Sequence, residues 1–329
     1  MIMNIYQQNM LEKVEGRLMA EISNTGFDVN ITTLTAIKAR VTDQKFYEVT
    51  PSDFMPVEVG ENPWATEQLT YTSFSTGDDF EKGIIEEGTN DGKMERTDTQ
   101  IGSIIVPRKV WGKTTNYNIA ELAQATKSGN WSLMEKKEES RFKNWQLGIQ
   151  RTAFLGLDSN PTVKGLLTQT NVNINTAVIT KTISSMSSTE FNTFLSTVLP
   201  VYFANSNSTV LADTFVMPMA DYLGLASAVD EGFPLKSRLE RLYEVFQTYV
   251  PAFAIEGLVY SSAANNNLGV NRYVMYRSND PSSLTFEIPV DYTTTIYDTV
   301  NGFNYSSVGY GQFASVEAYR PLEMLYFDF

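Results

Sequence analysis

Apolar positions recur along this chain with two different periods, and each period predicts one kind of element. Phe142, Trp145, Ile149 and Ala153 recur at helical spacing, which predicts one continuous helix over residues 133–155. At about 1.5 Å per residue this helix is roughly 35 Å long, the length of a spine rather than of a connector. We expect the four side chains to form its core face, with Trp145 buried against the strands at the end of the chain.

A period of two marks the C-terminal part of the chain. The alternating apolar residues are Leu284, Phe286, Ile288 and Val290. They predict a strand, and the pair Asn301-Gly302 predicts a hairpin turn. The chain is expected to finish on further strands.

Residues 61–106 combine strand-forming ends with a polar centre. The runs 69–74 and 101–106 are rich in strand formers, and residues 78–98 hold eight acidic against three basic residues. This centre has too few apolar side chains to offset an ordering cost of about 1–2 kcal/mol per residue. The sequence therefore predicts an extended hairpin arm that is stable only when it lies on another surface.

We expect the arm to take that surface from a neighbouring copy of the chain or to stay mobile. A strand-rich arm without a core gains buried surface and main-chain hydrogen bonds by lying across a neighbour. The candidate subunit-contact residues are Phe80, Lys82, Ile84, Ile85, Met94 and Arg96.

Helix starts are marked by four pairs of residues with capping-box spacing. They are Asn118 with Glu121, Ser132 with Glu135, Ser187 with Glu190, and Ser237 with Glu240. Gly156 and Pro251 are placed to end helices, and Pro200 to kink one. A short helix around residues 8–23 and a buried strand over residues 214–217 complete the pattern. The fold class predicted by this mixture is α+β.

Composition lowers the odds of an enzyme. The 329 residues include no histidine and no cysteine, which removes Ser–His–Asp and Cys–His catalysis and the commonest ligands for zinc, copper and iron–sulfur centres. Catalysis by carboxylates, Lys, Ser or Tyr stays open, but no spacing suggests the converging acid pair of a glycosidase. We therefore expect no cofactor, no metal and no catalytic residue.

The net charge of −13 argues against specific nucleic-acid binding, because an acidic chain does not attract phosphate backbones. The start of the chain lacks a signal-peptide pattern, and no apolar stretch approaches the roughly 18 residues of a membrane helix. These features predict a soluble protein, intracellular when made.

Three local patterns have more ordinary explanations than chemistry. The acids of residues 78–87 lack the spacing of a calcium loop and fit a solvated hairpin face better. Residues 309–311, Gly-Tyr-Gly, sit among strands and indicate strand bending rather than phosphate binding. The glycosylation pattern at residues 207–209 carries no weight without a secretion signal.

The order of these elements resembles the tailed-bacteriophage major capsid protein, the Hong Kong 97-like fold that encapsulin shells share. The local matches are Ile105-Val106-Pro107-Arg108, Asn118-Ile119-Ala120-Glu121-Leu122, Phe154-Leu155-Gly156, Val163-Lys164-Gly165-Leu166-Leu167-Thr168 and Arg320-Pro321. Thr168 stands where that turn often has Asn in the family. The short motifs are weak one by one, and the order of elements over nearly the whole chain is the stronger evidence.

The resemblance implies a division of the chain. It consists of an N-terminal arm with a short helix (1–60), an extended hairpin loop (61–106), a peripheral sheet domain with the spine helix (107–181 and 281–329) and an axial α/β domain (182–280). It also implies hexamers and pentamers that form an icosahedral shell around double-stranded DNA, touched without sequence specificity. Portal, scaffold or decoration proteins are implied partners, with assembly in the bacterial host cytoplasm and no membrane. Some relatives cross-link subunits through a lysine, and Lys82 is the residue of the arm that could do so. An encapsulin-type compartment enclosing cargo proteins is the alternative.

Overall fold

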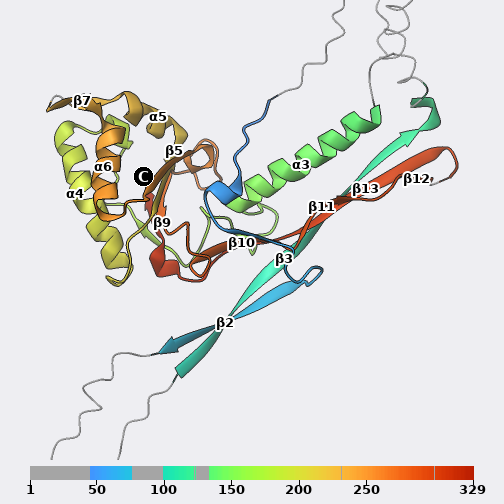
Figure 1. The fold of residues 1–329 in the computed structure, drawn as a ribbon, viewed down its shortest axis with the longest axis horizontal. Coiled ribbons are helices and arrows are strands. Elements are labelled where there is room, and N and C mark those ends of the chain that lie inside the picture. The colour runs from blue at the N-terminus through green and yellow to red at the C-terminus, as the bar shows by residue number, and fades with distance from the viewer. Residues whose placement is uncertain (1–44, 76–98, 122, 124–132, 231, 300) are drawn as a thin grey trace, which may run out of the picture. The chain divides into compact units, whose positions relative to one another are not determined.

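The computed structural model describes residues 45–75, 99–121, 123, 133–230, 232–299 and 301–329 (Figure 1). The chain forms two compact units: the first from residues 1–49, 110–150 and 292–311, the second from residues 50–109, 151–291 and 312–329. Helices and strands are mixed in the described residues, as the predicted α+β class requires. The expected helix at residues 8–23 lies outside the described residues.

Helix α3 (Leu133–Leu155) contributes most of its length to the first unit, and its bounds are those predicted from the apolar stripe. The strands that supply residues to this unit are β3 (Thr99–Asn118), β11 (Val290–Thr294), β12 (Asp298–Thr299) and β13 (Asn304–Ala314). The unit takes residues 110–118, 292–294, 298–299 and 304–311 of them. They belong to a sheet with the order β11-β13-β3-β2, in which β12 pairs with β13. Gly302, at a φ of +74°, precedes β13 where the hairpin turn was predicted.

Trp145 fixes α3 on these strands. It is buried, and its ring centroid lies 5.3 Å from that of Trp111 on β3 and 6.4 Å from that of Tyr292 on β11. A Cβ at Gly311 would come within 2.5 Å of the Trp145 ring, and one at Gly309 within 2.7 Å of Arg141 Nε. The two glycines of β13 therefore admit side chains of α3. The strand bending predicted for them stays a prediction.

The inward row of α3 starts at Arg141, not at Phe142. Ile149 and Ala153 are buried, as is Trp145, but Phe142 is 42% exposed and was wrongly assigned to the core. Residues spaced by four share a helix face, so Arg141 lies in line with Trp145 and Phe142 stands one position to the side. Arg141 is buried because its Nε donates to the Tyr292 hydroxyl at 2.8 Å and its Nη1 to the Ser307 carbonyl at 2.7 Å.

The second unit is built on a mixed five-stranded sheet of order β4-β15-β9-β5-β8. Its strands are β4 (Asn173–Asn175), β5 (Thr214–Pro218), β8 (Ala254–Leu258), β9 (Arg272–Tyr276) and β15 (Leu325–Asp328). The unit also contains α4 (Ser188–Asn205), α5 (Met219–Ser227), α6 (Arg238–Tyr249) and the two-stranded pair β6 (Val229–Asp230) and β7 (Phe233–Ser237). The predicted strand at residues 214–217 is the start of β5.

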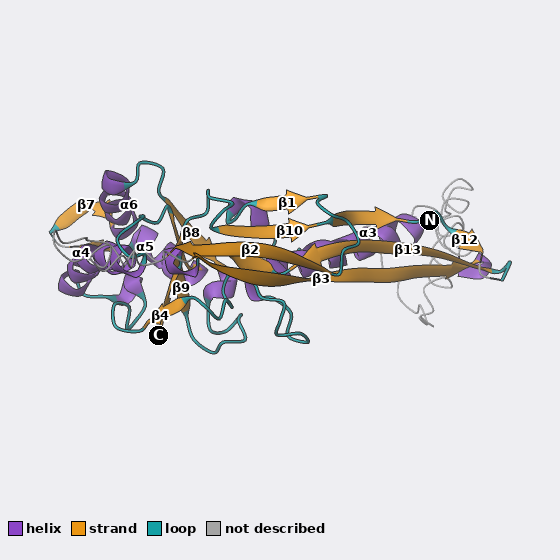
Figure 2. Ribbon diagram, turned by 90° about the horizontal axis from the view of Figure 1, so that it is seen from below, coloured by secondary structure: helices purple, strands orange, loops and turns teal. Residues whose placement is uncertain are grey.

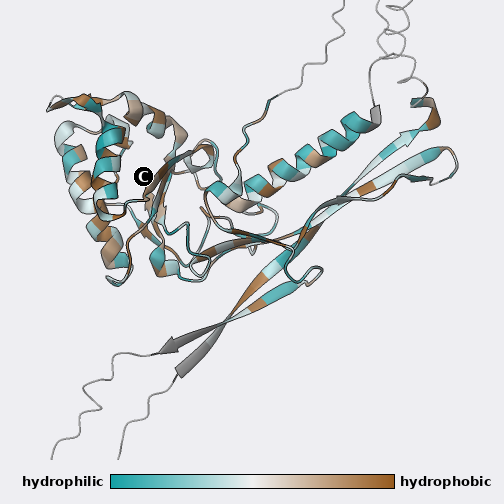
Figure 3. Cartoon of the chain, in the orientation of Figure 1, coloured by the Kyte–Doolittle hydropathy of each residue, from teal (hydrophilic) through white to brown (hydrophobic). Residues whose placement is uncertain are grey.

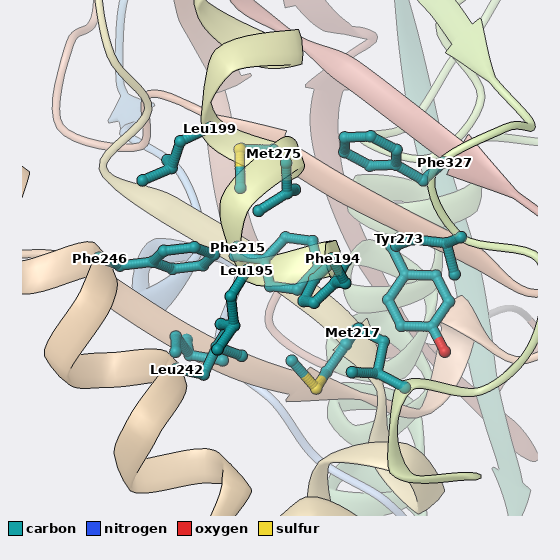
Figure 4. Packing of buried hydrophobic residues seen from close by; sticks show 14 of the residues in the cluster. Phe194, Leu195, Leu199, Phe215, Met217, Leu242, Phe246, Tyr273, Met275 and Phe327 are labelled. Atoms are coloured by element: carbon teal, nitrogen blue, oxygen red, sulfur yellow. The ribbon is translucent and has the colours of Figure 1, made fainter. Parts of the chain in front are cut away.

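Helices α4 and α6 pack on one face of this sheet. The alternate residues Phe215 and Met217 of β5, and Tyr273 and Met275 of β9, meet the apolar sides of both helices in one buried cluster (Figure 4). In Figure 3 the strands of this sheet are mostly brown, the colour of hydrophobic residues, whereas α3 carries both teal, hydrophilic bands and brown ones. The capping boxes predicted for Ser187 and Ser237 are present, and α6 ends before Pro251.

The end of α3 is capped by the turn at residues 165–168. The backbone N–H of Leu166 donates to the carbonyl of Ala153 at 2.8 Å, and that of Leu167 to Phe154 at 2.9 Å. Thr168 Oγ1 accepts from the Gly165 N–H at 2.8 Å and donates to the Leu155 carbonyl at 3.1 Å. These bonds satisfy carbonyls that a helix end leaves free.

Two glycines permit this close approach. Gly156, predicted to end the helix, has a φ of +77°. A Cβ at Gly165 would come within 2.4 Å of the Phe154 carbonyl carbon. The turn that resembles the capsid motif therefore has a structural role.

A three-stranded sheet of order β1-β10-β14 completes the second unit. It consists of β1 (Val57–Val59), β10 (Leu284–Ile288) and β14 (Val316–Ala318). Figure 2 shows β1 alongside β10, with which it pairs in parallel.

At the other predicted helix starts, the Glu121 N–H donates to Asn118 Oδ1 at 2.7 Å, while Ser132 lies outside the described residues.

Candidate subunit-contact surface

The base of the predicted arm is a two-stranded ribbon in the second unit. Strand β2 (Glu67–Ser75) pairs antiparallel with β3, with Glu67 opposite Pro107 and Ser75 opposite Thr99. Figure 1 shows the two strands extending side by side. The tip, residues 76–98, lies outside the described residues. The predicted contact residues there are Phe80, Lys82, Ile84, Ile85, Met94 and Arg96.

One face of the ribbon carries three exposed apolar side chains. Leu69 is 50% exposed, Tyr71 71% and Ile105 59%, and Leu69 lies directly opposite Ile105. Alternate residues of a strand share a face, so Leu69 and Tyr71 point the same way. These three residues were not among the predicted contact residues, although the alternation of Leu69 and Tyr71 with polar neighbours indicates a strand with one apolar and one polar face. We define Leu69, Tyr71 and Ile105 as the ribbon face.

The root of the ribbon is held by a buried arginine. Arg108 donates through Nη2 to Glu287 Oε2 at 2.7 Å and to the Gln68 side chain, and through Nη1 to the Asn62 carbonyl at 2.7 Å. Removing one partner of a buried, hydrogen-bonded ion pair leaves an uncompensated charge and is strongly destabilising. Arg108 therefore joins the loop before β2 to β10.

A buried glutamine makes a second attachment. Gln312 accepts from the Trp64 N–H at 2.7 Å and donates to the Ala65 carbonyl at 2.7 Å. Within this loop Asn62 and Trp64 have left-handed φ values of 45° and 68°, which cost free energy for residues with a Cβ. The two bonds from Gln312 hold the loop in that conformation, so the ribbon leaves the unit from a fixed point.

Three glutamates surround the attachment of Arg108. Glu58 lies opposite Glu287 in the parallel pair of β1 and β10, and Glu317 of β14 lies opposite Thr285, two residues before Glu287 on β10. Burial raises the pKa of Glu317 to about 7, Lys164 opposes that rise, and the Glu287 charge adds to it. Burial, with the charges of Glu61 and Glu287, also raises the pKa of Glu58.

The raised pKa of Glu317 predicts a pH-dependent stability. Because the folded chain holds this proton up to a pH of about 7 and the unfolded chain only to about 4.5, stability is lost as the pH rises between these values. Glu317→Gln removes the charge. After allowance for partial exposure, we expect it to stabilise the chain by about 1–2 kcal/mol at pH 8 and by little at pH 5.

Urea unfolding of the unassembled chain at both pH values measures this difference. Glu67→Gln, at an exposed position of β2, is the matched control and should change stability little at either pH. A Glu317→Gln variant that is equally stabilised at pH 5 and pH 8 would show that proton uptake is not the cause.

Among the described residues there is no group of His, Cys, Asp or Glu side chains that could hold a metal ion. The acid cluster of residues 78–87 lies outside them. No helix in the described part of the chain is long and apolar enough to cross a membrane.

The described residues combine a two-stranded ribbon with exposed apolar side chains, a long helix packed on a sheet and a mixed sheet covered by helices. The sequence matches the major capsid protein family over residues 82–329, more than half of the chain. The chain therefore belongs to this family and is a structural protein of a capsid shell. This match favours the capsid over the encapsulin-type alternative.

Solved capsids share the fold. The capsid of Myoviridae phage XM1 is 19% identical, with a TM-score of 0.75 over 92% of this chain and 99% of that one. The native GTA particle capsid is 12% identical, with a TM-score of 0.56 over 90% and 95%. The structure of Mycobacterium phage Ogopogo is 10% identical, with a TM-score of 0.55 over 90% of this chain and 96% of that one. The comparison with curated proteins gives no match.

Proposed function

We propose that copies of this chain assemble into hexamers and pentamers that close into an icosahedral shell around double-stranded DNA. The observation that carries the proposal is the ribbon face: Leu69, Tyr71 and Ile105 are exposed on a ribbon whose root is firmly held. An isolated two-stranded ribbon is marginally stable in water, so its apolar face favours a covering surface. A neighbouring copy is that surface.

The arm tip continues this contact in our proposal. Phe80, Ile84, Ile85 and Met94 supply its apolar side chains, and Lys82 and Arg96 supply charge among many acids. Charges across an interface set register and partner choice more than affinity. Closed symmetry then repeats each weak contact many times, so a modest contact per copy is sufficient.

The remaining assignments extend the same proposal. Residues 107–181 with 281–329 form the peripheral domain, and residues 182–280 the axial domain around the symmetry axes. The net charge of −13 suits a wall that touches packaged DNA without binding it tightly. Portal, scaffold or decoration proteins are its further partners, assembly takes place in the bacterial host cytoplasm, and the chain has no catalytic role.

Native mass spectrometry of the purified chain tests the ring sizes. We expect species of five and six copies, because closed cyclic contacts favour defined rings over open chains. Dilution should shift the population towards monomers without producing a ladder of all intermediate sizes. Dimers as the largest species at every concentration would contradict the proposed rings.

A further inference from the structure

An apolar groove lies on the helical side of the second unit. It is about 700 Å³ in volume and runs between α4 and α6. Its lining residues are Asn192, Leu195, Ser196, Leu199, Pro200, Phe203, Leu211, Val245 and Tyr249. Each of them is uncharged in a chain of net charge −13. Such a groove suits an apolar, uncharged occupant.

The same unit presents a projection with an exposed, apolar tip, beside which Lys236 is paired with Glu244 of α6. In the β6–β7 pair, Leu235 is 96% exposed, and Phe233 and Val229 are about half exposed. Residues 232–235, Gly-Phe-Pro-Leu, contain no charge. This two-stranded pair belongs to no larger sheet in the described residues. An almost fully exposed leucine gains nothing from the fold of its own subunit.

The projection is nevertheless rigidly attached. Asp230 of β6 is buried and accepts from Arg238 Nε at 2.9 Å, from the Arg241 guanidinium and from the Ser188 hydroxyl at 2.9 Å. The Arg241 guanidinium carbon also lies 4.1 Å from the centre of the Phe233 ring. These contacts join the base of the pair to the starts of α4 and α6, and Leu235 stands exposed beyond this fixed base.

We propose that the β6–β7 pair of one copy inserts Leu235 into the α4–α6 groove of the next copy in the ring. This inference rests on the proposed assembly into rings. A ring is closed by a heterologous contact, in which two different surfaces of the same subunit are complementary. The groove and the tip of the projection, residues 232–235, are such a pair: both are uncharged and apolar, one is hollow and the other stands out. A symmetric contact of two projections would leave both grooves open.

The absence of cysteine in the chain gives a direct test, because any introduced pair is the only source of disulfides. Ser196 lines the groove and is exposed. The variant Leu235→Cys with Ser196→Cys, assembled and then oxidised with copper phenanthroline, should give covalent oligomers up to closed rings on a non-reducing gel. Tyr249→Cys replaces Ser196→Cys if that substitution prevents folding.

The control pairs Leu235→Cys with Gln247→Cys. Gln247 is exposed on α6, two residues from both Val245 and Tyr249 and therefore on the far side of the helix from the groove. This control should stay monomeric on the gel.

Three results would overturn the inference. They are equal ladders for both pairs, dimers from Leu235→Cys alone, and particles visible by microscopy without any cross-link from either groove cysteine. Because the last result includes assembled particles, it leaves the proposed assembly standing. A wild-type chain that never assembles would overturn both.

Discussion

Replacing Leu69 by lysine and Ile105 by glutamate should yield a folded chain that no longer forms closed shells. The two residues lie directly opposite each other and are half or more exposed, so an opposite charge pair can keep the ribbon paired. The substitution removes two of the three side chains of the ribbon face. Covering the new charges with a neighbouring copy would then cost desolvation free energy.

Circular dichroism and thermal melting, run beside electron microscopy, separate folding from assembly. The control is Leu69→Val with Ile105→Val, which keeps the face apolar and should still assemble. Normal shells from the charged variant would show that the ribbon face contacts no neighbour. A charged variant that fails to fold would show that the ribbon belongs to the core of its own subunit.

Trp145→Ala should destabilise the chain by roughly 3–5 kcal/mol, typical of truncating a buried aromatic residue. The ring contacts Trp111 and Tyr292 and lies over Gly311, whose missing side chain makes the space for it. Neighbouring strands cannot easily fill the cavity, because β13 carries no Cβ at that position.

Chemical denaturation of the unassembled chain measures this loss. Phe142→Ala is the comparison. The Phe142 ring centroid lies 5.1 Å from that of Tyr292, but the residue is 42% exposed, so this variant should lose only about 1–2 kcal/mol of unfolding free energy. Equal losses for the two variants would mean that Trp145 is not the anchor of α3.

The sequence predicted most elements because their signals are local. The bounds of α3 follow from an apolar stripe and a terminal glycine, and Ser187 and Ser237 start α4 and α6 through bonds within one turn. The same local signal misplaced Phe142. The inward position belongs to Arg141, which is buried because Tyr292 and Ser307, distant in sequence, accept its hydrogen bonds.

The ribbon face was harder to predict because it depends on the pairing of two strands. Leu69 and Ile105 form one apolar patch only in the register that places them opposite each other. The sequence of either strand alone does not determine that register. Arg108 was noted only as part of a motif. Its role at the root of the ribbon requires the positions of Glu287 and Asn62.

Negative-stain electron microscopy of the purified wild-type chain, with light scattering on the same sample, tests the central claim most directly. The account predicts closed shells, or rings that convert into shells when concentration, salt or an added scaffold protein favours assembly. A chain that stays strictly monomeric under all of these conditions would contradict it.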